Sequence, residues 1–242
     1  MSLVSLAAEN KLPDIQIMDA ETCSWIANNR PKFGGKGHGE ITSYIFSNLD
    51  DLRSSQPKQE WFAREESFHS IHGAKHLVRC QIYAYMVGQY YELDKVWFNN
   101  LIIAAGIHDV ARLTDKDDMG HGDRSAQWFA QNHALFGELS EDSVNSICNA
   151  VALHNKDIND EVIADSDMRL VQYLKLVDAL DRYRLPKLKW WPNIEYISID
   201  CPEYFYEFAF DLVLRSEEIN LKKSNNGLSV FEALEEIHHE QK

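Results

Sequence analysis

Histidine and aspartate residues recur in this sequence at positions where the pattern predicts the apolar face of a helix. In the segment 73–91, His76 falls at three- and four-residue intervals with Cys80, Tyr83 and Val87, which places all four on one helix face. Burying such a polar group without a partner costs several kcal/mol. We therefore expect His76 to meet other polar groups inside the fold.

Other predicted helices carry polar residues of the same kind. His108 and Asp109 end the apolar segment 94–109, His154 extends the apolar stripe of a helix that starts at Ser140, and Asp178 lies on the stripe of a later one. Neutral imidazoles and carboxylates at this density are typical ligands of divalent metals. The sequence predicts a site for Mn²⁺, Fe²⁺, Co²⁺, Ni²⁺, Zn²⁺ or Mg²⁺.

The order of these residues resembles a known family. His76, then His108-Asp109, then Asp178 is similar to the H…HD…D pattern of the HD-domain superfamily of metal-dependent phosphohydrolases. The local contexts are similar as well, with Leu-Val-Arg after His76 and Leu-Val-Asp-Ala-Leu-Asp-Arg around Asp178. The resemblance covers about residues 68–185. It implies an all-α bundle in which these four residues hold a metal ion that assists hydrolysis of a phosphate ester.

Two more histidines resemble the additional ligands of family members that hold two metals. They are His121, in the polar loop 113–123, and His154. A second ion about 3.5 to 4 Å from the first would contact both the attacking and the leaving oxygen. The alternative is that His121 is a loop histidine and His154 a core histidine, which leaves one metal.

The resemblance also implies groups that act on the substrate. Asp109 would bridge the metals or orient the nucleophile. Arg112 and Arg124 are candidates to stabilise the charge on the phosphoryl oxygens, although Arg112 could instead pair with the acid-rich loop 115–118. His72, one turn before the first metal ligand, is a candidate general acid for the leaving group.

The remaining polar and aromatic residues have simpler interpretations. Arg79 and Arg182 are weaker phosphate-binding candidates, because each could pair with a nearby carboxylate. Lys75 is expected in solvent, the Trp190-Trp191 pair in helix packing, and the His238-His239 pair at an exposed, frayed end.

Helical periodicity dominates the chain and strand alternation is nearly absent, so we expect an all-α fold in a single structural domain. Residues 1–67 are expected as an N-terminal helical extension packed on the core, 68–185 as the HD-domain metal-binding core, and 186–242 as a C-terminal loop and helices. The predicted elements include helices at 73–91, 94–109, 125–135, 203–221 and 229–239, and a helix that starts at Ser140.

Composition narrows the class of protein. The 242 residues are 45% hydrophobic and 26% charged, as in ordinary soluble globular proteins. The net charge of -14 argues against an extended nucleic-acid groove but permits a nucleotide substrate. The four widely spaced cysteines suit a reducing cytoplasm, and neither a signal peptide nor a membrane-length apolar run is present. The oligomeric state stays open.

These observations lead to three hypotheses about function. The first is a metal-dependent phosphohydrolase that acts on a nucleotide or another small phosphate mono- or diester. The arrangement His72-Gly73-x-x-His76 also resembles phosphodiesterase domains of bacterial effectors that act on phosphoribosyl-linked ubiquitin. The second is therefore a phosphodiesterase for a phosphoribosyl-modified protein or a cyclic nucleotide. The third, from another class, is a metal-stabilised regulatory binding module without turnover.

Overall fold

The computed structural model describes residues 1–34, 39–156, 165–192, 197, 199–225 and 227–240. Within these ranges the chain forms eleven α-helices and no strand, in a single domain. The predicted all-α fold is therefore confirmed. Across this part of the chain, no helix has both the length and the apolar character needed to cross a bilayer.

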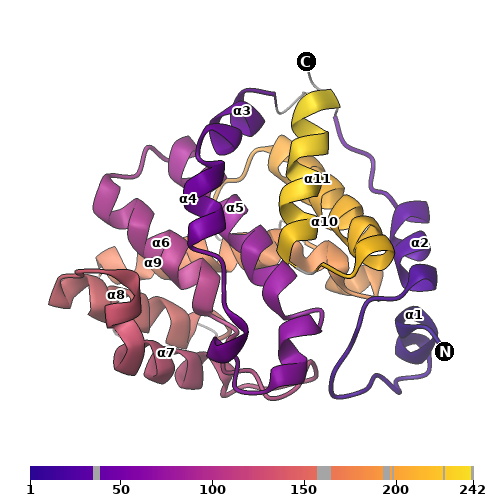
Figure 1. Ribbon diagram of the computed structural model, residues 1–242, viewed down its shortest axis with the longest axis horizontal. Helices are drawn as coiled ribbons and strands as arrows, with labels where there is room; N and C mark the ends of the chain where they lie inside the picture. The colour runs from indigo at the N-terminus through magenta and orange to yellow at the C-terminus, as the bar shows by residue number, and fades with distance from the viewer. Residues whose placement is uncertain (35–38, 157–164, 193–196, 198, 226, 241–242) are drawn as a thin grey trace.

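The helices are joined along the chain by connections of very different length. Their bounds are α1 Leu3–Ala8, α2 Ala20–Asn28, α3 Gly39–Ser47, α4 Leu49–Ser54, α5 Ala74–Tyr90, α6 Lys95–Ile107, α7 His121–Asn132, α8 Glu141–Leu153, α9 Asp165–Leu180, α10 Glu203–Lys223 and α11 Gly227–Glu240. Short 3₁₀ helices lie at Gln59–Trp61, Glu65–His69, His133–Phe136, Asp181–Arg184 and Leu188–Trp190. In Figure 1, α6 to α8 lie on one side of α5, and α10 and α11 lie on the other.

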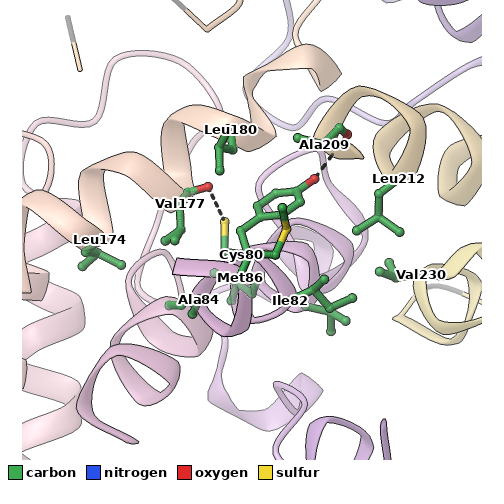
Figure 2. Packing of buried hydrophobic residues seen from close by; sticks show 14 of the residues in the cluster. Cys80, Ile82, Ala84, Met86, Leu174, Val177, Leu180, Ala209, Leu212 and Val230 are labelled. Atoms are coloured by element: carbon green, nitrogen blue, oxygen red, sulfur yellow. Dashed lines mark hydrogen bonds between the residues drawn. The ribbon is translucent and has the colours of Figure 1, made fainter. Parts of the chain in front are cut away.

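Helix α5 lies at the centre of the molecule, in contact with α6, α9, α10 and α11. Its residues from Ala74 to Gly88 are all buried. At Gly88 an added Cβ would lie 2.1 Å from the ring of Phe98, so only glycine permits this close approach of α5 and α6. Figure 2 shows the apolar side of α5 packed against side chains of α9, α10 and α11.

Helices α6 and α8 each begin after a capping side chain and are each followed by a histidine. Asp94 accepts hydrogen bonds from the first amides of α6, and Ser140 does the same for α8, as expected for good N-cap residues. Helix α6 is followed directly by His108 and α8 by His154. The two helices therefore deliver their C-terminal histidines to the same end of the bundle.

Several local predictions were wrong, and packing explains each case. Helix α7 begins at His121 rather than near Ser125, because Gly122 packs closely against the end of α8, and that contact leaves no local sequence signal. Lys75 is only 3% exposed and pairs with a carboxylate of α10. His238 is buried and stacks on Phe46, whereas its neighbour His239 is exposed as predicted.

Candidate metal centre

The ends of five helices bring six candidate ligands to one place. His76 comes from the first turn of α5 and Asp178 from the last turn of α9. The others lie at the ends of α6, α7 and α8. The complete set is His76, His108, Asp109, His121, His154 and Asp178, and each member lies within 4 Å of at least one other.

The first half of the cluster is built around His76 and His108. Their Nε2 atoms are 3.1 Å apart. Asp178 Oδ1 lies 3.4 Å from Nε2 of His76 and 3.9 Å from Nε2 of His108. Asp109 Oδ2 lies 3.6 Å from Nε2 of His76. Two imidazole nitrogens and two carboxylates thus face a common point.

The second half is built around His121 and His154, whose Nε2 atoms are 3.0 Å apart. Asp109 Oδ1 lies 3.0 Å from Nε2 of His121 and 3.8 Å from Nε2 of His154. The carboxylate of Asp109 therefore lies between the two histidine pairs, with one oxygen facing each pair. Such a carboxylate can bridge two neighbouring cations.

Hydrogen bonds behind the rings orient all four histidines in the same way. Each Nδ1 faces an oxygen that can only accept a hydrogen bond, so in the neutral ring Nδ1 carries the proton and Nε2 presents a lone pair. The acceptors are Asp181 Oδ2 for His76, Ala105 O for His108, Asp118 O for His121 and Val151 O for His154.

This orientation creates an electrostatic conflict that a cation would resolve. Burial, together with the charge of Arg184, holds the pKa of His76 well below its usual value, and burial beside His108 lowers the pKa of His154 to about 3. Neutral rings then direct lone pairs at one another. Two imidazole nitrogens that each lie about 2.0 to 2.1 Å from one metal ion are about 3 Å from each other at ordinary coordination angles. The observed separations therefore fit a shared metal ion.

His121 is the exception among the four histidines. Burial alone would lower its pKa, but the carboxylate of Asp109 outweighs the burial and raises it. The same contact, with the charge of Arg112, holds the pKa of Asp109 well below its usual range even though Asp109 is buried. A proton on His121 and a metal ion would therefore compete for the same place, and metal binding would release a proton.

Cys80 lies near the first histidine pair, and its sulfur falls within 4.8 Å of ligand atoms of His76, His108 and Asp178. We assign this thiol to packing. It donates a hydrogen bond to Val177 O over 3.6 Å, as Figure 2 shows. Its sulfur is also closer to Nδ1 of His76, at 3.5 Å, than to Nε2, at 4.0 Å. The thiol therefore lies behind the imidazole and away from its lone pair.

A buried charge network lies directly behind His76; it consists of Lys75, Arg79, Asp181 and Glu217. Asp181 accepts hydrogen bonds from Arg79 Nε at 2.6 Å and Nη2 at 2.9 Å, in addition to the one from His76. Glu217 pairs with Arg79 at 3.0 Å and with Lys75 at 2.8 Å. Arg79 thus pairs with carboxylates, the simpler of its two interpretations, and Asp181 connects the network to the candidate metal centre.

A cavity of about 340 Å³ is lined by four of the six candidate ligands, namely Asp109, His121, His154 and Asp178. Asp178 is 26% exposed and faces this space, whereas the histidine side chains are nearly inaccessible. In a chain of net charge -14, five cations line the cavity, namely Arg112, Lys156, Lys175, Arg182 and Arg184, together with four aspartates, of which Asp109 and Asp178 are candidate metal ligands. With divalent metal bound to those two aspartates, the cavity would suit an anionic ligand.

The arginines predicted to bind phosphate differ in where they lie. Arg112 lines the cavity, with Nη1 3.5 Å from Asp109, and donates to the carbonyl oxygens of Thr114 and Lys116 rather than to carboxylates of the loop 115–118. Arg124 is held by two hydrogen bonds to Asp118, of 2.7 and 2.6 Å, and does not line the cavity. Of these two arginines, only Arg112 is placed to meet an anion in the cavity.

His72 also lines the cavity, where Asp115 Oδ1 lies 2.8 Å from its Nδ1. Burial, with the charges of Arg112 and Arg184, lowers the pKa of His72 to about 4. The ring is therefore neutral in the free protein near pH 7. A negatively charged ligand in the cavity would raise this pKa again.

Two cationic residues were overlooked or undervalued by the sequence interpretation. Arg184 is 2% exposed, donates from Nε to Ile71 O, and has Nη2 3.9 Å from Asp178. Arg182 donates from Nε to Trp190 O, and its terminal nitrogens meet no partner among the described residues. Both follow Asp178 closely in the motif Asp-Ala-Leu-Asp-Arg-Tyr-Arg, which was the available signal.

The centre thus combines paired imidazole lone pairs, a carboxylate between them and a cationic cavity. These features can hold one or two divalent cations and an anion beside them. In comparisons with protein-family models, curated proteins and solved structures, this chain matches none.

Proposed function

We propose that this chain is a metal-dependent phosphohydrolase of the HD type. The observation that carries the proposal is the arrangement of two imidazole pairs around the carboxylate of Asp109, with Nε2 separations of 3.1 and 3.0 Å. The resemblance to the H…HD…D pattern and the cationic cavity support the same assignment. The proposed substrate is a nucleotide or another small phosphate mono- or diester.

Two divalent ions fit the arrangement better than one. His76, His108 and Asp178 would hold the first, His121 and His154 would hold the second, and Asp109 would bridge them. Because four of the six ligands are imidazoles, the site favours Mn²⁺, Fe²⁺, Co²⁺, Ni²⁺ or Zn²⁺ over Mg²⁺, which prefers oxygen ligands.

The surrounding residues would bind and orient the ester. When bound, the divalent ions would activate water and neutralise charge on the phosphoryl group. Arg112 and Arg184 would contact the phosphoryl oxygens, since a guanidinium can bind two such oxygens together. His72, oriented by Asp115, would donate a proton to the leaving oxygen once the phosphate has raised its pKa.

The test compares metal content and hydrolysis in three variants. Wild type, His108→Ala and Asp109→Ala are purified with His133→Ala, which changes a histidine outside the cavity. Metal content is measured by atomic emission, and cleavage of p-nitrophenyl phosphate and bis(p-nitrophenyl) phosphate is measured with Mn²⁺. We expect metal and turnover in wild type and His133→Ala, and neither in the other two variants.

The opposite results identify the alternatives. A wild type that retains metal but cleaves neither these esters nor a panel of nucleotides would support the regulatory binding module. Cleavage confined to cyclic nucleotides or to phosphoribosyl-linked protein would support the specialised phosphodiesterase.

A further inference from the structure

A second cavity, of about 450 Å³, adjoins the first. Both are lined by His72, Arg112, Asp117, Arg182 and Leu185. The two cavities therefore meet where the proposed general acid and two of the arginines lie. A group bound at the metal centre would have direct access to this second space.

The walls of the second cavity come from segments outside the helices that carry the metal ligands. One wall is the connection between α1 and α2, with Asn10, Leu12 and Gln16, and the other is the segment after α9, with Lys187 and Trp190. These segments belong to the regions outside 68–185 or at its border, for which the sequence suggested no role.

Hydrogen bonds tie these walls to each other and to the centre. Lys187 Nζ donates to Asn10 Oδ1 at 2.9 Å, so the two walls are joined directly. The backbone amide of Gln16 donates to Asp115 Oδ2 at 2.6 Å, and Asp115 in turn orients His72. The position of the cavity relative to the metal centre is therefore set by the buried contact between Gln16 and Asp115, and an exposed contact joins its two walls.

The lining combines four apolar side chains with nine polar or charged ones. Leu12, Ile71, Leu185 and Trp190 supply the apolar part. Lys187 lies with Nζ 4.8 Å from the centre of the Trp190 ring. Apolar surface beside several polar groups can hold an organic ligand that has both kinds of surface, and a tryptophan in the wall suits a flat ring.

We propose that the second cavity binds the leaving group of the substrate, and that this group is a nucleoside. The assignment rests on the proposed function, because the phosphorus must lie at the metal centre. Water would form a new bond to phosphorus and release a proton, and the bond from phosphorus to the nucleoside oxygen would break. That oxygen would take a proton from His72, and the proton released by the water would replace it. The nucleoside would leave through the second cavity, and phosphate, or a phosphomonoester from a diester, would remain.

The first test compares two phosphate monoesters that differ only in their leaving group. Phosphate release is measured for adenosine 5′-monophosphate and for glycerol 2-phosphate in wild type, Trp190→Ala, Lys187→Ala and Lys189→Ala. Lys189 is exposed and lies two residues from Lys187 outside the cavity, so it is the matched control. We expect Trp190→Ala to lower kcat/KM roughly ten- to hundredfold for the nucleotide, the range that lost stacking of one base implies.

The other arms of that experiment define specificity. Lys187→Ala is expected to lower kcat/KM for the nucleotide severalfold, whereas Lys189→Ala leaves it unchanged. Cleavage of glycerol 2-phosphate is expected to stay within about twofold of wild type in all three variants. Equal losses on both esters, or no loss on the nucleotide, would overturn the assignment.

A binding measurement separates this inference from the proposed function. Adenosine is titrated against metal-loaded wild type, Trp190→Ala and Lys187→Ala, and heat of binding is recorded, with thermal unfolding as the check that each variant folds. Binding that is lost in both cavity variants supports the second cavity even if no ester is cleaved. Turnover of nucleotides without any adenosine binding would contradict the nucleoside assignment and leave the phosphohydrolase proposal standing.

Discussion

Two buried polar clusters lie side by side on helix α5, and they differ in how their charges are balanced. In the charge network, each guanidinium or ammonium group meets a carboxylate, as Arg79 does with Asp181 and Glu217 at 2.6 and 3.0 Å. In the candidate metal centre, imidazole lone pairs face one another, as in His76 and His108 at 3.1 Å. The first cluster is complete within the protein, and the second becomes complete with a cation.

Both clusters consist of buried polar groups, so burial by itself does not tell which of them binds a ligand. A buried ion pair roughly offsets its own desolvation cost, so the charge network supports the structure without needing a ligand. A buried set of like lone pairs has no such compensation in the protein. Asp181 joins the two clusters, because it accepts hydrogen bonds from Arg79 and from His76. The charge network therefore holds the His76 ring in its orientation.

The largest expected effect comes from the residue between the two histidine pairs. Asp109→Asn removes the proposed bridging charge, and hydrolysis with Mn²⁺ should fall by about 10³-fold, the upper range for lost electrostatic stabilisation. The bound metal, measured by atomic emission, should fall with it. If the Asp109→Asn protein kept its metal and most of its activity, the conclusion that the cluster around Asp109 needs a metal ion would be contradicted.

The next largest effect is on stability, from the charge network. Glu217→Gln leaves Lys75 and Arg79 partly unpaired in the core, so the free energy of unfolding should fall by about 3 to 5 kcal/mol, measured by urea denaturation without metal. Metal content after folding should stay at the wild-type level. Loss of metal with unchanged stability would reverse the roles assigned to the clusters.

The stability lost in Glu217→Gln should also depend on pH, which provides a second measurement of the role of Glu217. Burial would raise the pKa of Glu217, but Lys75 and Arg79 outweigh it and lower the pKa below 4.5. A carboxylate with a lowered pKa contributes stability that is fully present above its unfolded pKa and is lost as the pH falls through the folded one. The difference between wild type and Glu217→Gln should therefore shrink below about pH 4.5.

Metal binding should stabilise the protein only through the candidate metal centre. Mn²⁺ at 100 times its dissociation constant should add about 2.7 kcal/mol to the free energy of unfolding, seen as a rise in Tm. The rise should be absent in His108→Ala and present in Glu217→Gln. An equal rise in His108→Ala would show that Mn²⁺ binds elsewhere.

A smaller effect is expected where the clusters join. Asp181→Asn weakens the hydrogen bond that orients His76, and loss of such a support typically lowers metal affinity about 10- to 100-fold. Competition with a fluorescent chelator measures this change. Unchanged affinity in a folded Asp181→Asn protein would show that the charge network has no influence on the metal centre.

The smallest effect is expected at Arg124. The Arg124 side chain is 35% exposed in its ion pair with Asp118 and does not line the cavity. Arg124→Ala should therefore change kcat/KM less than about threefold and the stability by less than about 1 kcal/mol. Arg112→Ala serves as the contrast, with a larger loss of kcat/KM expected. Comparable losses in the two variants would place Arg124 in the binding of substrate after all.

The sequence by itself determined the helical class and the inward direction of the candidate ligands. Both follow from local periodicity, because a residue three or four positions from apolar neighbours must share their face whatever the helix packs against. His76 and Asp178 could be placed in this way. The start of α8 was equally local, since Ser140 caps its own helix.

Only the tertiary structure decided which faces meet. Asp181 lies 105 residues from His76 in the sequence. Lys75 was predicted to lie in solvent, because no residue near it in the sequence indicates its partner, Glu217 on α10. The second cavity likewise forms between segments far apart in the chain, as the bond from Lys187 to Asn10 shows. Periodicity records the direction of a side chain, whereas charge pairing and cavities depend on contacts that form only when distant segments pack together.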